Sequence, residues 1–219
     1  MVKAGDMKIN LRNVGKRFNR EWIFRNLDHQ FTSGTSYAIT GPNGSGKSTL
    51  LQIVGGATTL SEGEISYDHN GTVTTENVYK NISIAAPYLE LIEEMTVTEI
   101  LSFHGSMKPF ISSLRGTKQS QINEIIEIIG LQKSAHKEIR FYSSGMKQRV
   151  KLAQAIFSDV PLILLDEPCT NLDEEGISLY KRLVNDYCKD RLVLVSSNDK
   201  NEYDFCREVL DIRTVKKVE

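Results

Sequence analysis

The chain is poor in the residues that mark disulfide-bonded or zinc-binding proteins. Only three of its 219 residues are cysteine, and Cys169, Cys188 and Cys206 form no C-x-x-C pair. An odd number of widely spaced cysteines argues against a disulfide framework and against a zinc site. We therefore expect reduced thiols and a cytoplasmic protein.

Long apolar runs and an excess of charge of one sign are also missing. The longest apolar run, residues 160–165, has the length of a strand, whereas a membrane-spanning helix needs about 20 apolar residues. The 27 basic and 28 acidic side chains give a net charge of −1, without the basic excess typical of nucleic-acid binding. We expect no nucleic-acid partner, and a role at a membrane would need a partner that brings the chain there.

Strand-like and helix-like segments alternate along the chain, which predicts a mixed α/β fold. The apolar patterns predict strands at residues 7–14, 22–24, 27–31, 37–40, 65–67, 82–86, 162–165 and 192–195. Asn70-Gly71 predicts a hairpin turn after the fifth of these strands.

Helical patterns occupy two regions. Residues 96 to 140 have helical periodicity, which begins at a predicted capping box from Thr96 to Glu99 and has a stop signal at Gly130. A further helix is predicted over residues 174–188. We expect one domain over residues 1–219, with a core formed by 1–86 and 141–219 and a helical subdomain over 87–140.

A glycine-rich loop lies between the predicted strand at residues 37–40 and the apolar face of a predicted helix at residues 50–54. Its glycines let consecutive N–H groups point at an anion, which the helix N-terminus also favours. Lys47 can reach the β- and γ-phosphates of a nucleotide, and the Ser48 hydroxyl can hold Mg²⁺. The alternative is a glycine-rich turn that binds nothing. The loop fits G-x-x-x-x-G-K-[ST] and reads Gly41-Pro42-Asn43-Gly44-Ser45-Gly46-Lys47-Ser48-Thr49.

Two carboxylates follow the apolar strand at residues 162–165. Open α/β sheets bind ligands at the carboxyl ends of their strands. Asp166 is placed to bind Mg²⁺ as the acidic partner of Ser48, and Glu167 to act as the general base toward the attacking water. The alternative is a solvated Asp-Glu-Pro turn.

A third motif, residues 142–149, precedes this pair and opens a helix. Ser143 is a good N-cap, and a serine, a glycine and a helix N-terminus together favour an anion. Locally, an ordinary capped helix explains the pattern equally well.

In this order the motifs resemble those of the ATP-binding subunits of ABC (ATP-binding cassette) transporters, over nearly the whole chain. Residues 41–49 match Walker A, 142–148 the signature loop, 162–167 Walker B, and 170–173, with Asp173, the D-loop. Phe18 matches the aromatic residue that stacks on adenine, although a core phenylalanine at a strand end is the alternative. The resemblance implies a P-loop NTPase core of the ABC ATPase type, with an antiparallel β subdomain and a helical insert.

The resemblance also implies how such a subunit works. Two subunits, identical or different, form a head-to-tail dimer with two ATP molecules and Mg²⁺ at the interface. The signature loop of one subunit, here Ser143, Ser144, Gly145 and Met146, covers the ATP held by the other. ATP closes the dimer, and hydrolysis reopens it and drives a membrane permease that holds the subunit at the inner face of the cell membrane.

The form of the signature loop is similar to that of exporter ATPases. In size the chain is similar to the haem-exporter ATPase of cytochrome c maturation. We therefore expect an exporter, whose substrate is not readable from this subunit.

Three positions depart from the family pattern. Pro87 stands where the family has a glutamine, and proline has no side-chain donor or acceptor; Glu90 could replace that glutamine only after a shift of the loop. Asn198 stands where the family has a histidine, so it can hydrogen-bond the γ-phosphate without a positive charge. Ser144 replaces the first glycine of the signature. These departures predict ATP hydrolysis that is slow or depends on the permease.

Two other functions compete with the transport ATPase. A non-transport ABC ATPase of translation or DNA maintenance would usually have a second cassette, coiled coils or zinc-binding cysteines, which the sequence lacks. A regulatory module that closes on ATP without turnover is favoured by Pro87 and Asn198, but Glu167 argues against it.

Overall fold

The computed structural model describes residues 6–215, which form two compact units. The first unit contains residues 6–82, 161–166 and 190–215, and the second contains residues 83–160 and 167–189. The division into a core and a helical subdomain over 87–140 stays a prediction. Among residues 6–215, no helix is both long enough and apolar enough to cross a bilayer.

An antiparallel sheet with the strand order β2-β1-β4-β5 belongs to the first unit. It consists of β1 (Lys8–Phe18), β2 (Glu21–Thr32), β4 (Glu62–Asp68) and β5 (Thr72–Val73). The predicted strands 22–24 and 27–31 are wrong as separate elements, because β2 is continuous through Asn26. Asn26 has a φ of 58°, a conformation that asparagine tolerates, and shifts in the β1–β2 register accompany it.

The predicted Asn70-Gly71 turn is confirmed, since it joins β4 to its antiparallel partner β5. Asn70 and Gly71 have φ values of 55° and 120°, as tight hairpin turns require. β4 begins at Glu62, earlier than predicted, because Glu62 and Glu64 pair with Gly15 and Arg12 of β1.

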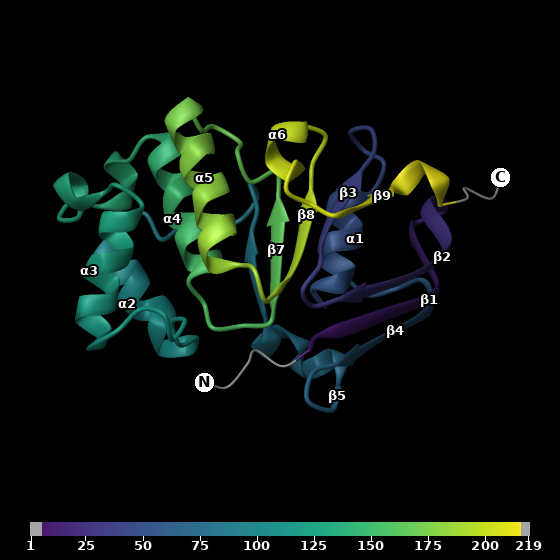
Figure 1. The fold of residues 1–219 in the computed structure, drawn as a ribbon. Helices are drawn as coiled ribbons and strands as arrows, with labels where there is room; N and C mark the ends of the chain where they lie inside the picture. The colour runs from purple at the N-terminus through teal and green to yellow at the C-terminus, as the bar shows by residue number, and fades with distance from the viewer. Residues whose placement is uncertain (1–5, 216–219) are drawn as a thin grey trace. The chain divides into compact units, whose positions relative to one another are not determined.

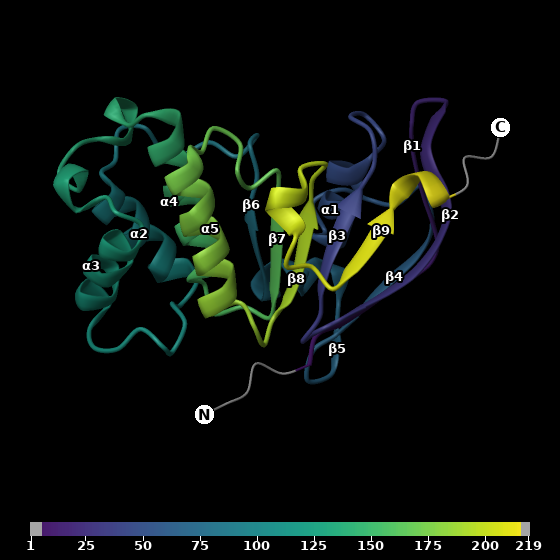
Figure 2. The ribbon, with the colours of Figure 1, turned by 45° about the horizontal axis from the view of Figure 1, so that its top comes forward.

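A parallel sheet of the first unit places the ends of its strands side by side in the order β7-β8-β3-β9 (Figure 2). The strands are β3 (Ser36–Thr40), β7 (Leu162–Asp166), β8 (Leu192–Ser196) and β9 (Glu208–Asp211). β7 and β8 are buried along their whole length, as is usual for strands of a parallel sheet. The apolar patterns did not predict β9, which lies at the edge of the sheet and is partly exposed.

The same unit contains α1 (Lys47–Val54), the short α6 (Lys200–Tyr203), and the 3₁₀ turns η1 (Thr75–Asn81) and η4 (Ile212–Thr214). Buried Tyr67 of β4 donates its hydroxyl to the carbonyls of Ile53 and Val54 at the end of α1. This links the antiparallel sheet to the helix that follows the phosphate loop.

The second unit is mainly helical (Figure 1). Its helices are α2 (Val97–Met107), α3 (Lys118–Ile128), α4 (Ser144–Ile156) and α5 (Glu174–Tyr187), with 3₁₀ turns η2 (Gln132–Ser134) and η3 (Ile139–Phe141). The strand β6 (Ile82–Ala85) begins at the last residue of the first unit and continues into this one. α4 and α5 lie side by side in both ribbon views.

The predicted helix signals are confirmed. Thr96 and Glu99 form a reciprocal capping box at the start of α2. The Ser143 hydroxyl accepts a hydrogen bond from the backbone of Met146 at the start of α4. Gly130 follows the end of α3 with a φ of 72°.

Candidate nucleotide-binding site

The phosphate loop connects the end of β3 to the first residue of α1, Lys47. Gly46 precedes that residue with a φ of 99°, which residues other than glycine rarely adopt. A Cβ at Gly46 would lie 2.3 Å from Cγ2 of Ile23, so no larger residue fits unless the Ile23 side chain shifts. The loop therefore has the strand–loop–helix surroundings in which backbone N–H groups bind phosphate.

Lys47 lies across the loop with only 5% of its surface exposed. Its Nζ donates to the carbonyl of Gly41 at 2.8 Å and to that of Pro42 at 3.3 Å. These two carbonyls stabilise the buried ammonium of Lys47. A bound phosphate would compete with them for the same donor.

Three buried polar atoms near the carboxyl ends of the strands lack a hydrogen-bond partner among the described residues: Ser45 Oγ, Asp166 Oδ1 and Ser196 Oγ. The sheet register places two of them together, because Asp166 of β7 pairs with Ser196 of β8, and Ser196 pairs with Ile39 of β3. Neighbouring strands lie about 4.8 Å apart. Asp166 at the end of β7 is therefore two strand spacings from β3, which leads into the phosphate loop. Since buried polar groups are normally paired, these atoms indicate a place for a polar ligand.

The donor set at this edge fits Mg²⁺. Magnesium prefers carboxylate and hydroxyl oxygens and is usually held by one or two carboxylates together with substrate phosphates. Asp166 supplies a carboxylate that is only 2% exposed, and Ser48 lies at the second residue of α1.

Asn198 contacts the phosphate loop directly. Its Oδ1 accepts from the backbone N–H of Gly41 at 3.2 Å, and its Nδ2 donates to Oδ1 of Asn43 at 3.1 Å. The structure thus brings Asn198, predicted from its place after β8, to two residues of the loop.

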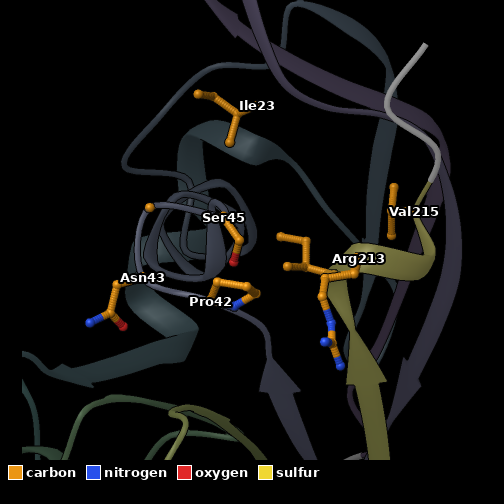
Figure 3. A pocket seen from close by; sticks show the side chains of 8 residues that line it. Ile23, Pro42, Asn43, Ser45, Arg213 and Val215 are labelled. Atoms are coloured by element: carbon orange, nitrogen blue, oxygen red, sulfur yellow. The ribbon is translucent and has the colours of Figure 1, made fainter. Parts of the chain in front are cut away.

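A cavity of about 350 Å³ borders the loop (Figure 3). Asn43 and Arg213 lie at opposite ends of it. Sequence reasoning missed Ile212, Arg213 and Val215, because nothing in a segment so distant along the chain signals proximity to the loop. Arg213 forms an ion pair with Asp211, which lowers the pKa of that carboxyl to about 2. The lining residues are Ile23, Pro42, Asn43, Gly44, Ser45, Ile212, Arg213 and Val215.

Phe18 is the last residue of β1, and half of its surface is exposed. The alternative that it is a core phenylalanine is therefore wrong. Lys16 Nζ lies 4.7 Å from the centroid of the ring, a cation–π distance. The exposed ring can stack on a planar ligand.

Glu167 begins a tight turn directly after β7. Its φ is 43°, which is uncommon for a residue other than glycine and is typical of strained positions at functional sites. Its carbonyl accepts from the backbone N–H of Thr170 at 3.1 Å, and its side chain is exposed. Asp173, at the end of the turn, caps α5 by accepting from the backbone of Gly176 at 2.8 Å.

The signature segment forms the N-terminus of α4. Ser143 and Ser144 are exposed there, and Gly145 and Met146 are half-buried. Pro87 is exposed as well, and its carbonyl accepts a hydrogen bond from Lys151 Nζ of α4 at 3.1 Å. Sequence reasoning gave no role to Lys151, and it included the buried Gln148 in the signature segment without a role of its own.

A family profile described as ABC transporter matches residues 24–170. The chain belongs to the ABC transporter family. The predicted resemblance is confirmed, and so is the fold class, a mixed α/β ABC ATPase fold with an antiparallel and a parallel sheet.

Relatives in this family differ in length and in named function. The chain is 28% identical over 193 residues to the uncharacterized ABC transporter ATP-binding protein YhcH of Bacillus subtilis, covering 87% of this chain but only 61% of that relative. It is 28% identical over 191 residues to the cytochrome c biogenesis ATP-binding export protein CcmA of Mesorhizobium japonicum, covering 87% and 91%. It is 32% identical over 169 residues to the sulfate/thiosulfate import ATP-binding protein CysA of Pseudomonas syringae, covering 76% and 52%.

A solved structure has the same fold. It is the dimeric, post-hydrolysis structure of the ATP-binding cassette MJ0796 bound to ADP and Pi, whose sequence is 26% identical to that of this chain. It has a TM-score of 0.75, and the match covers 93% of each chain.

Proposed function

We propose that this chain is the ATP-binding and ATP-hydrolysing subunit of an ABC exporter and drives a separate permease through ATP-dependent closure of a dimer. The observation that carries the proposal is a buried carboxylate oxygen of Asp166 that has no hydrogen-bond partner within residues 6–215 and lies at the same sheet edge as the phosphate loop. A phosphate loop alone indicates an anion site, whereas a loop with this carboxylate fits a nucleotide and a metal ion together.

The residues divide into those that hold ATP and those that hold the metal. Residues 41–49 would bind the phosphates, with Lys47 exchanging the carbonyls of Gly41 and Pro42 for phosphate oxygens, while Phe18 would stack on the adenine. Ser48 and Asp166 would hold Mg²⁺, which neutralises phosphate charge when bound.

Hydrolysis needs a base and donors near the γ-phosphate. Glu167 is the proposed general base, because its exposed carboxylate follows directly after Asp166. Asn198 already bonds the loop and would offer the γ-phosphate a neutral donor. Ser143, Ser144, Gly145 and Met146 would act on the ATP of the second subunit, and Asp173 would belong to the loop between the two sites.

The partners are a second ATPase subunit, identical or different, and a membrane permease that would keep the subunit at the cytoplasmic face of the membrane. The relative CcmA is named as an export protein, which favours export, whereas CysA is named as an import protein. Dimer formation is favoured by the dimeric MJ0796 structure. Slow hydrolysis without the permease is part of the proposal, since Pro87 cannot supply a side-chain hydrogen bond.

A regulatory subunit that closes on ATP without turnover is the second candidate. The bonds of Asn198 to Gly41 and Asn43 favour it, because they hold this side chain on the loop rather than free for the γ-phosphate. A non-transport ABC ATPase has no comparable observation in its support.

The deciding experiment compares ATP binding with phosphate release by the purified protein in Mg-ATP. We expect binding together with slow release that Glu167→Gln abolishes and that the control Glu174→Gln, at an exposed position on α5, leaves unchanged. Binding without release would favour the regulatory subunit. Co-purification with a multi-span membrane protein would test the permease.

A further inference from the structure

Helix α4 is hydrogen-bonded to two loops of its own unit. Gln148 Nε2 donates to the carbonyl of Pro168 at 2.7 Å. Lys151 Nζ, three residues further on, donates to the carbonyl of Pro87 at 3.1 Å and more weakly to that of Ala86 at 3.4 Å. Residues three apart lie on the same side of a helix. One side of α4 thus holds both the turn after Glu167 and the loop at Pro87.

From this contact we propose that Gln148 is a positioning residue for Glu167. Pro168 directly follows Glu167, so the bond to its carbonyl fixes the peptide group next to the proposed base. Gln148 is only 3% exposed. Its amide therefore has little access to water, and loss of the bond would leave a buried donor unpaired.

The turn needs an external restraint because it is strained. A residue other than glycine at a φ of 43°, as Glu167 is, is strained and persists only where its surroundings fix it. Within the turn, Glu167 accepts one backbone hydrogen bond from Thr170, and Leu172 donates another to Cys169. Gln148 adds a bond from outside the turn to the carbonyl of the residue that follows Glu167.

The N-terminal part of α4 contacts the same turn at two further places. A Cβ on Gly145 would lie 3.0 Å from the carbonyl oxygen of Asn171, so the helix approaches the turn closely. Nη2 of Arg149 lies 3.6 Å from Oδ1 of Asp173 and 3.5 Å from Oε1 of Glu175. A movement of the start of α4 would therefore move the turn that carries Glu167.

The consequence rests on the proposed function. If Ser143 and Gly145 bind the ATP of the second subunit, a shift of α4 on binding would change the placement of Glu167 at the ATP of its own subunit. Gln148 would connect the start of α4 to Glu167, because its hydrogen bond reaches Pro168, the residue next to the proposed base. Coupling of this kind is reciprocal for binding free energies.

The test is Gln148→Met in the full chain, which keeps the length of the side chain and removes the donor. We expect kcat to fall about tenfold or more, because small misplacements of catalytic groups have effects of this size, with KM for ATP changed less than twofold. Amide exchange at Thr170 should become faster, both in the otherwise wild-type chain and in a Glu167→Gln background, because the bond from Gln148 goes to the carbonyl of Pro168 and not to the Glu167 side chain. Gln154→Met, a half-buried position on the same helix, is the matched control and should leave all of these unchanged.

The outcomes separate this inference from the proposed function. Unchanged kcat and unchanged Thr170 exchange in Gln148→Met, with Glu167→Gln inactive, would overturn the role of Gln148 and leave the ATPase intact. If the wild type releases no phosphate, the ATPase proposal is wrong, and exchange at Thr170 still decides whether Gln148 holds the turn. If Gln148→Met fails to fold, Gln148→Asn replaces it in the test. Its side chain is one methylene shorter, so the donor is withdrawn from the carbonyl of Pro168 and kcat should fall by a smaller factor. A wild-type kcat in Gln148→Asn would overturn the inference.

Discussion

Lowering the pH below 6.5 should destabilise the helical unit through one half-buried histidine. His104 of α2 lies with Nε2 2.7 Å from the hydroxyl of Ser158, which itself donates to the carbonyl of Gln154. Burial, helped by the positive charge of Lys108 and opposed by a backbone hydrogen bond at Gln154, lowers the pKa of His104 from 6.5 to about 4. The folded chain therefore keeps this imidazole neutral at pH values where the unfolded chain binds a proton.

The sign and size of the effect follow from these two pKa values. Above pH 6.5 the imidazole is neutral in both states, so it adds no pH dependence. Between pH 6.5 and about 4, the unfolded state binds more protons, and the free energy of unfolding falls by about 1.4 kcal/mol per pH unit. The loss from His104 alone is about 2 kcal/mol at pH 5 and reaches at most about 3 kcal/mol below pH 4.

Urea denaturation of the wild type and of His104→Gln at pH 7.5 and pH 5 isolates this contribution, because every other group titrates in both proteins. The wild type should lose about 2 kcal/mol more than the variant over this range. His136→Gln, at an exposed position, should keep the full wild-type dependence. If the two losses agree within about 0.5 kcal/mol, the limit of additivity for independent sites, the assignment to His104 is wrong.

Substitutions of Gly46 in the phosphate loop and of Asn198, which contacts the loop, give two further predictions. Gly46→Ala should lower the free energy of unfolding by more than the ~1–2 kcal/mol of left-handed strain, and should weaken ATP binding, because its Cβ meets Ile23. The control Gly44→Ala should show the strain alone, because a Cβ at Gly44 has open space. Equal losses of stability for the two variants in urea denaturation would contradict the contact with Ile23. Asn198→His should raise phosphate release about fivefold, since a charged donor adds about 1 kcal/mol to a neutral one, and unchanged release would contradict the view that the missing charge slows hydrolysis.

Local sequence patterns determined the elements whose causes lie within a few residues. The capping box at Thr96 and Glu99, the N-cap at Ser143 and the Asn70-Gly71 turn were all predictable, because each depends on a side chain or a φ value close by in the chain. The glycine loop belongs to the same group, since its flanking strand and helix adjoin it. These features were enough for the motifs, their order and the family.

Contacts between distant segments could not be predicted in this way. The continuity of β2 depends on register shifts in its pairing with β1, and the edge strand β9 forms only because β3 offers it a partner. Likewise, the position of Ile212 and Arg213 beside the phosphate loop follows from the path of the chain after β9. None of these has a local signal, because the interacting partner is far away in the sequence.

By itself, therefore, the sequence determined that this chain carries Walker A, signature and Walker B motifs in the order of the ABC family, because each motif is a run of neighbouring residues. Only the tertiary structure decided how those motifs are held. It placed Asn198 on the phosphate loop, left an oxygen of Asp166 without a partner in the described part of the chain, and joined Gln148 to the residue after Glu167. The physical reason is that hydrogen bonding and burial at these positions depend on strand register and helix packing, which no single run of residues contains.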